Sequence, residues 1–148
     1  MSRTASLAPE PVPKTLGILV IDDDRVSGRS LCRALAKLRP SYAVELSTSS
    51  EMAISRLSSG GYDVVVMDLE LPSIPAPALF ERIARERPEV IRVAHSSRSE
   101  ATQRCEPRPR VDAVVGKPVT PLRLLAVIEQ VLAAEPHRRG GLPGTTNA

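Results

Sequence analysis

Aromatic residues are almost absent from this chain of 148 residues, which has no tryptophan and only Phe80, Tyr42 and Tyr62. A hydrophobic core must therefore be built from Val, Ile, Leu and Ala. Apolar residues make up 42% of the sequence, which is enough for such a core. The length suits one compact domain and leaves no room for a second of ordinary size.

Cysteines and long apolar runs are also scarce. Cys32 and Cys105 are the only cysteines, and neither has the spacing of a metal site or of a disulfide framework. They indicate a reduced intracellular pair. No stretch approaches the roughly 20 apolar residues of a membrane span, and the N-terminus lacks the apolar run of a secretory signal. We expect a cytoplasmic protein that does not associate with a membrane.

The formal net charge is +3 and the pI is about 9.2. The excess of cations lies at the two ends of the chain, for example in Arg138 and Arg139, so that residues 16–135 are neutral overall. A basic pI can indicate nucleic-acid binding. Because no basic helix face is interleaved with aromatic residues, we expect no DNA-binding domain.

Composition divides the chain into three parts. Residues 1–15 are polar and rich in proline, which predicts a disordered N-terminal arm. Residues 136–148 are rich in glycine and polar, which predicts a flexible tail that completes the chain. The intervening region, 16–135, is predicted to be the folded domain.

Apolar runs and helical periodicities alternate along residues 16–135. Strands are expected at 16–21, 42–47, 64–67, 90–94 and 113–115, and helices at 26–38, 51–57, 78–87 and from Thr120–Pro121 onward. The last helix has a predicted buried stripe of Leu122, Leu125, Ile128, Val131 and Leu132. This order predicts an α/β fold with a doubly wound, five-stranded parallel sheet and helices on both faces.

One segment fits this alternation poorly. A fourth helix is expected between the last two strands, yet 97–110 has only Ala101 and Cys105 as apolar residues and is interrupted by Pro107 and Pro109. We expect this helix to be short or irregular.

Chemically useful side chains follow four of the predicted strands. They are Asp22, Asp23 and Asp24, then Asp68, then Ser96 and Ser97, and finally Lys117. In a doubly wound sheet, ligands bind outside the carboxyl ends of the strands. Carboxylates that converge there require a cation, and oxygen ligands favour Mg²⁺. The lysine and the hydroxyls suit an anionic phosphoryl group. Each residue alone is more often a turn or cap residue, but their conjunction indicates a functional site.

The segments ILVIDDD, VVVMDLELP and VVGKP resemble the signature segments of response-regulator receiver domains, the CheY-like superfamily. The similarity covers about residues 16–135. It implies a flavodoxin/CheY-like fold and a stand-alone, single-domain receiver of a two-component system, which takes a phosphoryl group from a histidine kinase or a phosphotransfer protein. It further implies signalling to an unknown downstream protein, as a monomer or weak dimer. No catalysis is expected beyond the domain's own phosphorylation and dephosphorylation.

The resemblance also implies a role for each site residue. Asp68 would be the phosphoacceptor and a ligand of Mg²⁺. Asp23 would bind the metal directly, Asp22 mainly through water, and Glu70 through its backbone carbonyl. Lys117 would pair with the phosphoryl oxygens.

A hydroxyl is expected to follow the phosphoryl group and switch the domain. Ser96 fits the family spacing best, because it lies 28 residues after Asp68 and 21 before Lys117. Ser97 is the alternative.

Two other functions remain open at this point. Asp22 to Val26 matches the nucleophile motif of haloacid-dehalogenase-like phosphohydrolases, but no acidic pair follows Lys117 at a further strand end, and Asp68 would have no role. A receiver-fold binding module that works without phosphorylation is the second alternative, and the poor segment 97–110 favours it.

Overall fold

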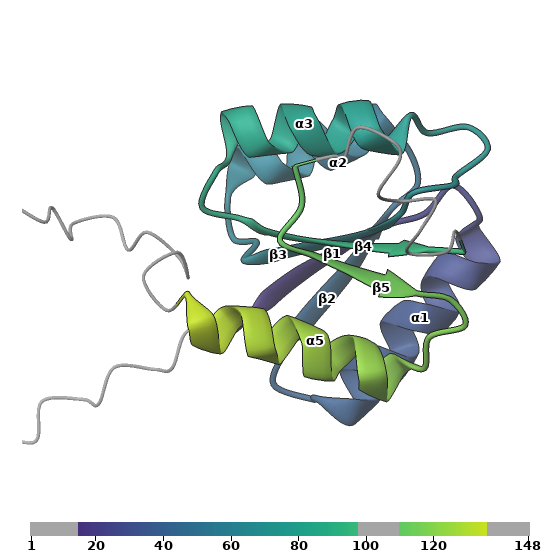
Figure 1. The fold of residues 1–148 in the computed structure, drawn as a ribbon, viewed down its shortest axis with the longest axis vertical. Helices are drawn as coiled ribbons and strands as arrows, with labels where there is room; N and C mark the ends of the chain where they lie inside the picture. The colour runs from purple at the N-terminus through teal and green to yellow at the C-terminus, as the bar shows by residue number, and fades with distance from the viewer. Residues whose placement is uncertain (1–14, 98–109, 136–148) are drawn as a thin grey trace, which may run out of the picture.

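The computed structural model describes residues 15–97 and 110–135, and these form a parallel sheet with helices on both faces (Figure 1). The strand order is β2-β1-β3-β4-β5. The strands are β1 (Gly17–Ile21), β2 (Ala43–Ser47), β3 (Val64–Asp68), β4 (Ile91–Ser96) and β5 (Ala113–Gly116). The predicted doubly wound, flavodoxin/CheY-like α/β fold is confirmed.

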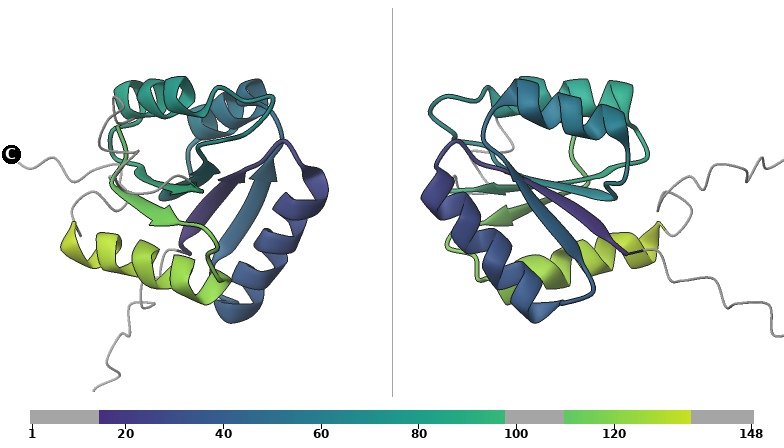
Figure 2. Two further views of the ribbon diagram at one scale, coloured as in Figure 1. Left: turned by 45° about the vertical axis from the view of Figure 1, so that its right-hand side comes forward. Right: turned by 180° about the vertical axis from the view of Figure 1, so that it is seen from behind.

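The helices lie in two layers. Helices α1 (Arg25–Leu38) and α5 (Pro121–Ala134) cover one face of the sheet, and α2 (Ser50–Ser59) and α3 (Ala76–Glu86) cover the other (Figures 1 and 2). The predicted arm at 1–15, the tail at 136–148 and the irregular fourth helix within 97–110 fall almost wholly outside the described residues.

Two aliphatic cores flank the sheet, because successive residues of a strand point to opposite faces. Toward α1 and α5 lie Ile18, Val20, Val64, Val66 and Val93. Toward α2 and α3 lie Leu19, Ile21, Val65, Met67 and Ala94, together with Phe80 of α3. Strands β1 and β3 are buried on both faces, as their continuous apolar runs predict.

Capping residues mark the ends of two helices, as the sequence predicts. Thr120 caps α5 by accepting a hydrogen bond from Arg123 N at 3.1 Å, and Pro121 occupies the first helical position. Helix α2 ends at Gly60 and Gly61, whose φ angles of 80° and 91° lie in the left-handed region that favours glycine.

Two apolar residues of the predicted helical patterns are not buried. Leu122, assigned to the buried stripe of α5, is 58% exposed, and Val26 in α1 is 80% exposed. At 3.6 residues per turn, Leu122 points about 110° away from the centre of the arc that is actually buried. That arc consists of Leu124, Leu125, Ile128 and Leu132. Val26 points about 180° away from buried Leu35, so it faces solvent.

A buried arginine connects the last two strands. Arg92 of β4 is 8% exposed and donates hydrogen bonds from Nε to the Arg110 carbonyl at 2.8 Å and from its guanidinium to the Val90 carbonyl at 3.0 Å. Its backbone N–H donates to the Asp112 carboxylate at 2.8 Å. These contacts hold the start of β5 against β4 and thereby position the strand that leads to Lys117.

Within the described residues, none of the helices combines the length and the apolar character needed to cross a bilayer.

Candidate functional site

The carboxyl ends of the strands bring the predicted site residues to one edge of the sheet. The register pairs Asp68 of β3 with His95 of β4, and Ser96 of β4 with Gly116 of β5. Lys117 follows β5 and donates its backbone N–H to the Ser96 carbonyl at 2.8 Å. Asp22 follows β1 and donates its backbone N–H to the Ser47 carbonyl of β2 at 3.1 Å.

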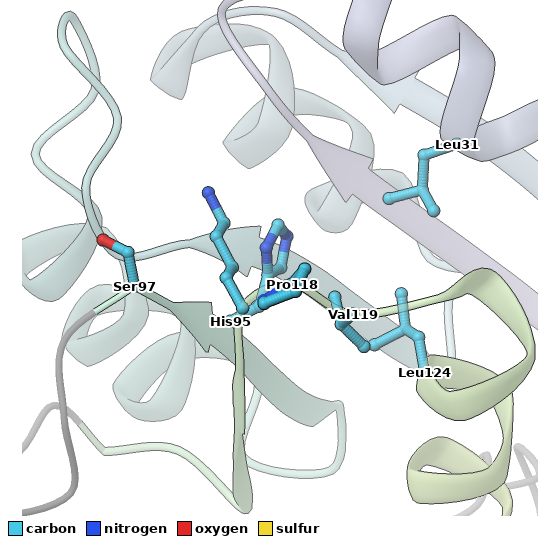
Figure 3. Close-up of a pocket in the computed structure, with 7 residues that line it drawn as sticks. Leu31, His95, Ser97, Pro118, Val119 and Leu124 are labelled. Carbon is cyan, nitrogen blue, oxygen red and sulfur yellow. The ribbon is translucent and has the colours of Figure 1, made fainter.

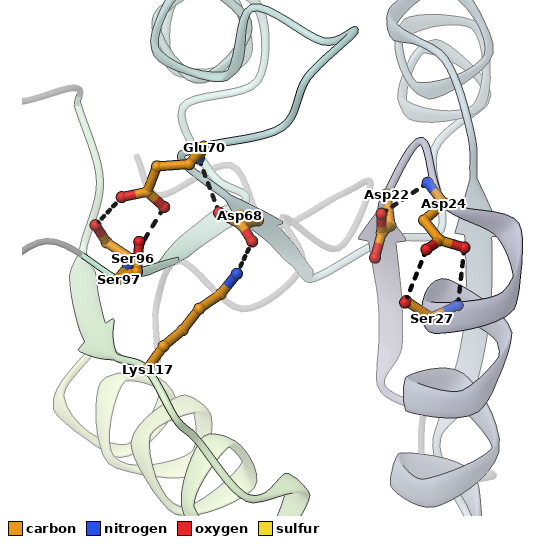
Figure 4. A network of polar contacts seen from close by, with 8 residues as sticks. All are labelled: Asp22, Asp24, Ser27, Asp68, Glu70, Ser96, Ser97 and Lys117. Atoms are coloured by element: carbon orange, nitrogen blue, oxygen red, sulfur yellow. Dashed lines mark hydrogen bonds and ion pairs between the residues drawn. The ribbon is translucent and has the colours of Figure 1, made fainter.

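Asp68 is held from two sides (Figure 4). Its Oδ2 accepts a hydrogen bond from Lys117 Nζ within an ion pair, and its Oδ1 accepts one from Glu70 N at 2.8 Å. Burial by itself would raise the pKa of Asp68, but the hydrogen bonds from Lys117 and Glu70 N outweigh it and hold the pKa below its usual value. Asp68 is therefore an oriented carboxylate, ionised at neutral pH.

The carboxylates of the three consecutive aspartates after β1 have different hydrogen-bond partners. Asp24 is the N-cap of α1, where its carboxylate accepts hydrogen bonds from Val26 N at 2.9 Å and from Ser27 N at 3.2 Å. These bonds lower the pKa of Asp24. Asp23 Oδ2 accepts a hydrogen bond from Ser73 N at 2.7 Å, which ties the loop after β3 to the end of β1.

The ionised form of Asp22 is disfavoured by its surroundings. Its Oδ1 accepts a hydrogen bond from Asp24 N at 2.9 Å. Burial raises the pKa of Asp22, and the negative charges of Asp23, Asp24 and Asp68 raise it further, despite that hydrogen bond. Among the described residues, no three acidic, histidine or cysteine side chains already form a cage for a metal ion.

Glu70 spans the distance between β3 and the end of β4 (Figure 4). Its carboxylate accepts a hydrogen bond from the Ser96 hydroxyl and a longer one, of 3.4 Å, from Ser97 N. Ser96 is fully buried, whereas Ser97 is exposed. The two candidate switch hydroxyls therefore differ in environment, and the Ser96 hydroxyl is engaged by a side chain that comes from the loop after the proposed phosphoacceptor.

A cavity of about 570 Å³ opens beside this site, between α1 and the segment that joins β5 to α5 (Figure 3). Its polar groups come from Lys117, His95 and Ser97, and Leu31, Val119 and Leu124 line its apolar walls. Burial lowers the pKa of His95, and so does the charge of Lys117, although the Asp68 carboxylate opposes them. His95 is therefore a neutral imidazole at pH 7, in β4 opposite Asp68.

Sequence reasoning did not find the roles of Asp24, Ser73 and His95. An aspartate immediately before a helix is a recognisable capping signal, and it could have separated Asp24 from its two neighbours. His95 directly precedes Ser96 in β4 and could have been placed opposite Asp68 by aligning the strand ends. The contact of Asp23 with Ser73 spans 50 residues and has no local signal.

Comparisons with known proteins agree with this geometry. Residues 18–129 match the family model described as the response regulator receiver domain. The chain is 30% identical, over 82% of its length, to the sensor histidine kinase RcsC of Salmonella typhimurium, of which it covers 12%. It is 40% identical, over 38% of its length, to the transcriptional regulatory protein QseB of Haemophilus influenzae, of which it covers 25%. The chain thus spans a quarter or less of these two relatives.

Solved structures share the fold at low sequence identity. The signal receiver domain of an HD domain-containing protein from Pseudomonas fluorescens superposes with a TM-score of 0.74 at 22% identity, covering 92% of this chain and all of that one. The receiver domain from Methanospirillum hungatei has a TM-score of 0.70 at 21% identity, with 83% and 98% coverage. The family model, the sheet order and the site at the strand ends agree, and the chain belongs to the response regulator receiver domain family.

Proposed function

We propose that this domain accepts a phosphoryl group on Asp68 and passes the signal on through contacts with another protein. The observation that carries the proposal is the double restraint on Asp68, whose oxygens are held by Lys117 Nζ and by Glu70 N at the end of the central strand. An oriented, ionised carboxylate beside a lysine is suited to attack an electrophilic phosphorus atom.

In the proposed reaction, a carboxylate oxygen of Asp68 forms a bond to phosphorus, and the bond from phosphorus to the donor breaks. With a phosphohistidine donor, the electron pair of the broken bond stays on the imidazole nitrogen, and Asp68 becomes an acyl phosphate. Charge on the transferred group is spread over its equatorial oxygens in a loose transition state, so that positioning and electrostatic stabilisation dominate catalysis. Lys117 supplies a positive charge at this position and would stay with the phosphoryl oxygens after transfer.

The acidic residues at the end of β1 fit a hard divalent cation such as Mg²⁺. Asp22, Asp23 and Asp68 offer only oxygen donors. Burial raises the pKa of Asp22, and the neighbouring carboxylates raise it further; a cation would relieve the repulsion from these carboxylates. We assign Asp23 and Asp68 as direct ligands, together with the backbone carbonyl of Glu70, and Asp22 as a ligand acting mainly through water. When bound, Mg²⁺ would neutralise charge on the transferred group.

Ser96 is the proposed switch residue. Its hydroxyl donates to the Glu70 carboxylate in this structure, and it would have to leave that partner to donate to a phosphoryl oxygen. The exchange would couple the chemistry at Asp68 to the end of β4 and to the chain that follows it, as a small two-state movement. Ser97 is exposed and does not need to break such a bond.

The phosphodonor in this proposal is a histidine kinase or a phosphotransfer protein, and the output is a contact with a further protein. One of the relatives is itself a sensor histidine kinase and another is a transcriptional regulatory protein, which supports a place in two-component signalling. A solved structure of the same fold, the receiver domain of DrrB, is described as activated by beryllofluoride, a phosphoryl analogue.

Intact mass spectrometry with acetyl phosphate tests the proposal. The wild type should gain one labile phosphoryl mass only when Mg²⁺ is present, and Asp68→Asn should gain none. Asp23→Ala should abolish the binding of Mg²⁺, and the labelling that needs it, more completely than Asp22→Ala, because only Asp23 is assigned as a direct ligand. Equal labelling of the wild type and Asp68→Asn would refute the assignment of Asp68. Absence of labelling in the wild type would favour a binding module that works without phosphorylation.

A further inference from the structure

The loop between β3 and α3, residues 69–75, donates main-chain hydrogen bonds to two carboxylates of the candidate site. Glu70 N donates to Asp68 Oδ1 at 2.8 Å, and Ser73 N donates to Asp23 Oδ2 at 2.7 Å. The second bond reaches from this loop to the end of β1. One loop, which we call the β3–α3 loop, therefore contacts both the proposed phosphoacceptor and the aspartate assigned as a direct metal ligand.

The β3–α3 loop is restrained on both sides of Ser73. The next residue, Ile74, is 5% exposed and packs in the core between the sheet and helices α2 and α3. Pro72 precedes Ser73, and Pro75 follows Ile74. Proline fixes its own φ and restricts the residue before it, and the loop contains no glycine. The backbone N–H of Ser73 is thus held by its neighbours, while Ser73 itself is exposed.

Asp23 has little else to orient it. It lies between Asp22 and Asp24, whose carboxylates accept hydrogen bonds from other main-chain groups of the same turn. Within residues 15–97 and 110–135, Ser73 N is the only group that donates a hydrogen bond to Asp23, and Asp23 Oδ1 accepts none. One oxygen of Asp23 is therefore held by the β3–α3 loop, and the other is left for a cation.

A restrained carboxylate binds an ion better than a free one. A side chain that is mobile before binding loses rotamer freedom when it becomes a ligand, and this loss weakens the binding. A hydrogen bond to one oxygen of a ligating carboxylate fixes the direction of the other oxygen. Removal of such a supporting hydrogen bond typically weakens metal binding by about 10-fold to 100-fold.

We propose that the backbone N–H of Ser73 positions Asp23 for Mg²⁺, so that Ser73 is a positioning residue of the metal site. The inference rests on the proposed function, which assigns Asp23 as a direct ligand. Ser73 acts through Asp23 and touches neither the ion nor the phosphoryl group. Its hydroxyl has no part in this role, because the donor is the main chain.

Titration of the full chain with Mn²⁺, followed by electron paramagnetic resonance of the free ion, tests the inference without any phosphodonor. Mn²⁺ prefers oxygen ligands as Mg²⁺ does, and displacement by Mg²⁺ then gives the affinity for that ion. Ser73→Pro removes the N–H and should bind both ions about tenfold more weakly or worse. Ser73→Ala is the matched control, because it keeps the N–H and removes only the hydroxyl, and it should bind like the wild type.

A proline at position 73 can also disturb the β3–α3 loop, so a second variant isolates the hydrogen bond. Replacing the amide of Ser73 by an ester, through incorporation of the α-hydroxy analogue of serine, removes the donor and keeps the side chain. The ester variant should lose affinity for Mn²⁺ as Ser73→Pro does. If Ser73→Pro melts at a lower temperature than the wild type in EDTA, the ester variant decides.

An ester variant that binds Mn²⁺ as tightly as the wild type would overturn the inference, and so would an equal loss of affinity in Ser73→Ala. Asp23→Ala separates this inference from the proposed function. If Asp23→Ala loses Mn²⁺ and the ester variant keeps it, the ligand assignment stands and the role of Ser73 falls. If Asp23→Ala binds Mn²⁺ like the wild type, both are wrong.

Discussion

The hydrogen bond from Ser96 to Glu70 predicts that removing the Glu70 side chain makes the domain easier to activate. The Ser96 hydroxyl cannot donate both to the Glu70 carboxylate and to a phosphoryl group at Asp68. Glu70 therefore holds the hydroxyl in the unphosphorylated arrangement. The substitution Glu70→Ala leaves the backbone carbonyl in place and removes the carboxylate that accepts from the Ser96 hydroxyl and, at 3.4 Å, from Ser97 N.

The expected magnitude follows from the chemistry of the bond. A hydrogen bond to a charged group contributes about 1.5–3 kcal/mol, and the lower end applies because Glu70 is only partly buried. Since about 1.4 kcal/mol corresponds to a factor of ten, Glu70→Ala should bind beryllofluoride about tenfold more tightly than the wild type in the presence of Mg²⁺. Isothermal titration calorimetry measures this affinity directly.

A double-mutant cycle separates the hydrogen bond from the mere loss of a negative charge near an anion. Glu70→Gln removes the charge but keeps an oxygen acceptor for Ser96, so it should show a smaller gain than Glu70→Ala. In a Ser96→Ala background, only the purely electrostatic part of the gain should remain. An unchanged or weaker affinity of Glu70→Ala, or an equal gain with and without the Ser96 hydroxyl, would refute the competition.

Three further expectations concern stability. In EDTA, Asp22→Asn should raise the melting temperature at neutral pH, because a carboxyl with a raised pKa costs stability while it is ionised. In a series of thermal melts, this gain should vanish as the pH falls through the raised pKa toward 3.8. Lys117→Met should destabilise the fold above pH 3.8 and flatten its acid denaturation below it, because the lowered pKa of Asp68 gives a stabilisation that protonation removes; an unchanged acid transition would contradict the ion pair. Gly17→Ala places a Cβ 2.1 Å from the Gly61 carbonyl and should lower the free energy of unfolding by about 2 kcal/mol or more in urea, whereas Gly116→Ala, with no atom within 4 Å, should stay within about 0.5 kcal/mol.

The fold could be predicted from the sequence because each strand carries its own local signal. The runs at Leu16 to Ile21 and at Val64 to Met67 are apolar at every position, which is typical of strands covered on both faces. Turn and cap residues such as Gly60 and Thr120 then mark the ends of helices. The alternation of these signals leaves few topologies open, and the parallel sheet follows.

Burial within helices was less predictable. Leu122 was assigned to the buried stripe of the last helix, yet it faces solvent, because the position of the buried arc depends on how the whole helix lies on the sheet. The exposed cations of α1 were also missed, since a charge count over residues 16–135 is neutral; they are Arg25, Arg29, Arg33 and Lys37. Only the helical geometry shows that cations gather on one face while the compensating acids lie elsewhere.

The site could be predicted as a set of strand-end residues, because in a parallel sheet the carboxyl ends of strands meet at one edge. The hydrogen-bond partners of these side chains could not be predicted, because they depend on side-chain rotamers and on the path of the loops. For example, the role predicted for Glu70 rests on its backbone carbonyl, whereas its carboxylate lies at the end of β4 against Ser96 and Ser97.

The most direct test of the central claim is to locate the phosphorylated residue chemically. Borohydride reduces an aspartyl phosphate to homoserine, with loss of the phosphate, and so leaves a stable mark at the acceptor. After treatment with acetyl phosphate and Mg²⁺, then borohydride and proteolysis, tandem mass spectrometry should find homoserine at position 68 and unmodified aspartate at positions 22, 23 and 24. Homoserine at any of those three positions, or at none of the four in protein that has gained the phosphoryl mass, would contradict the assignment of Asp68 as the acceptor.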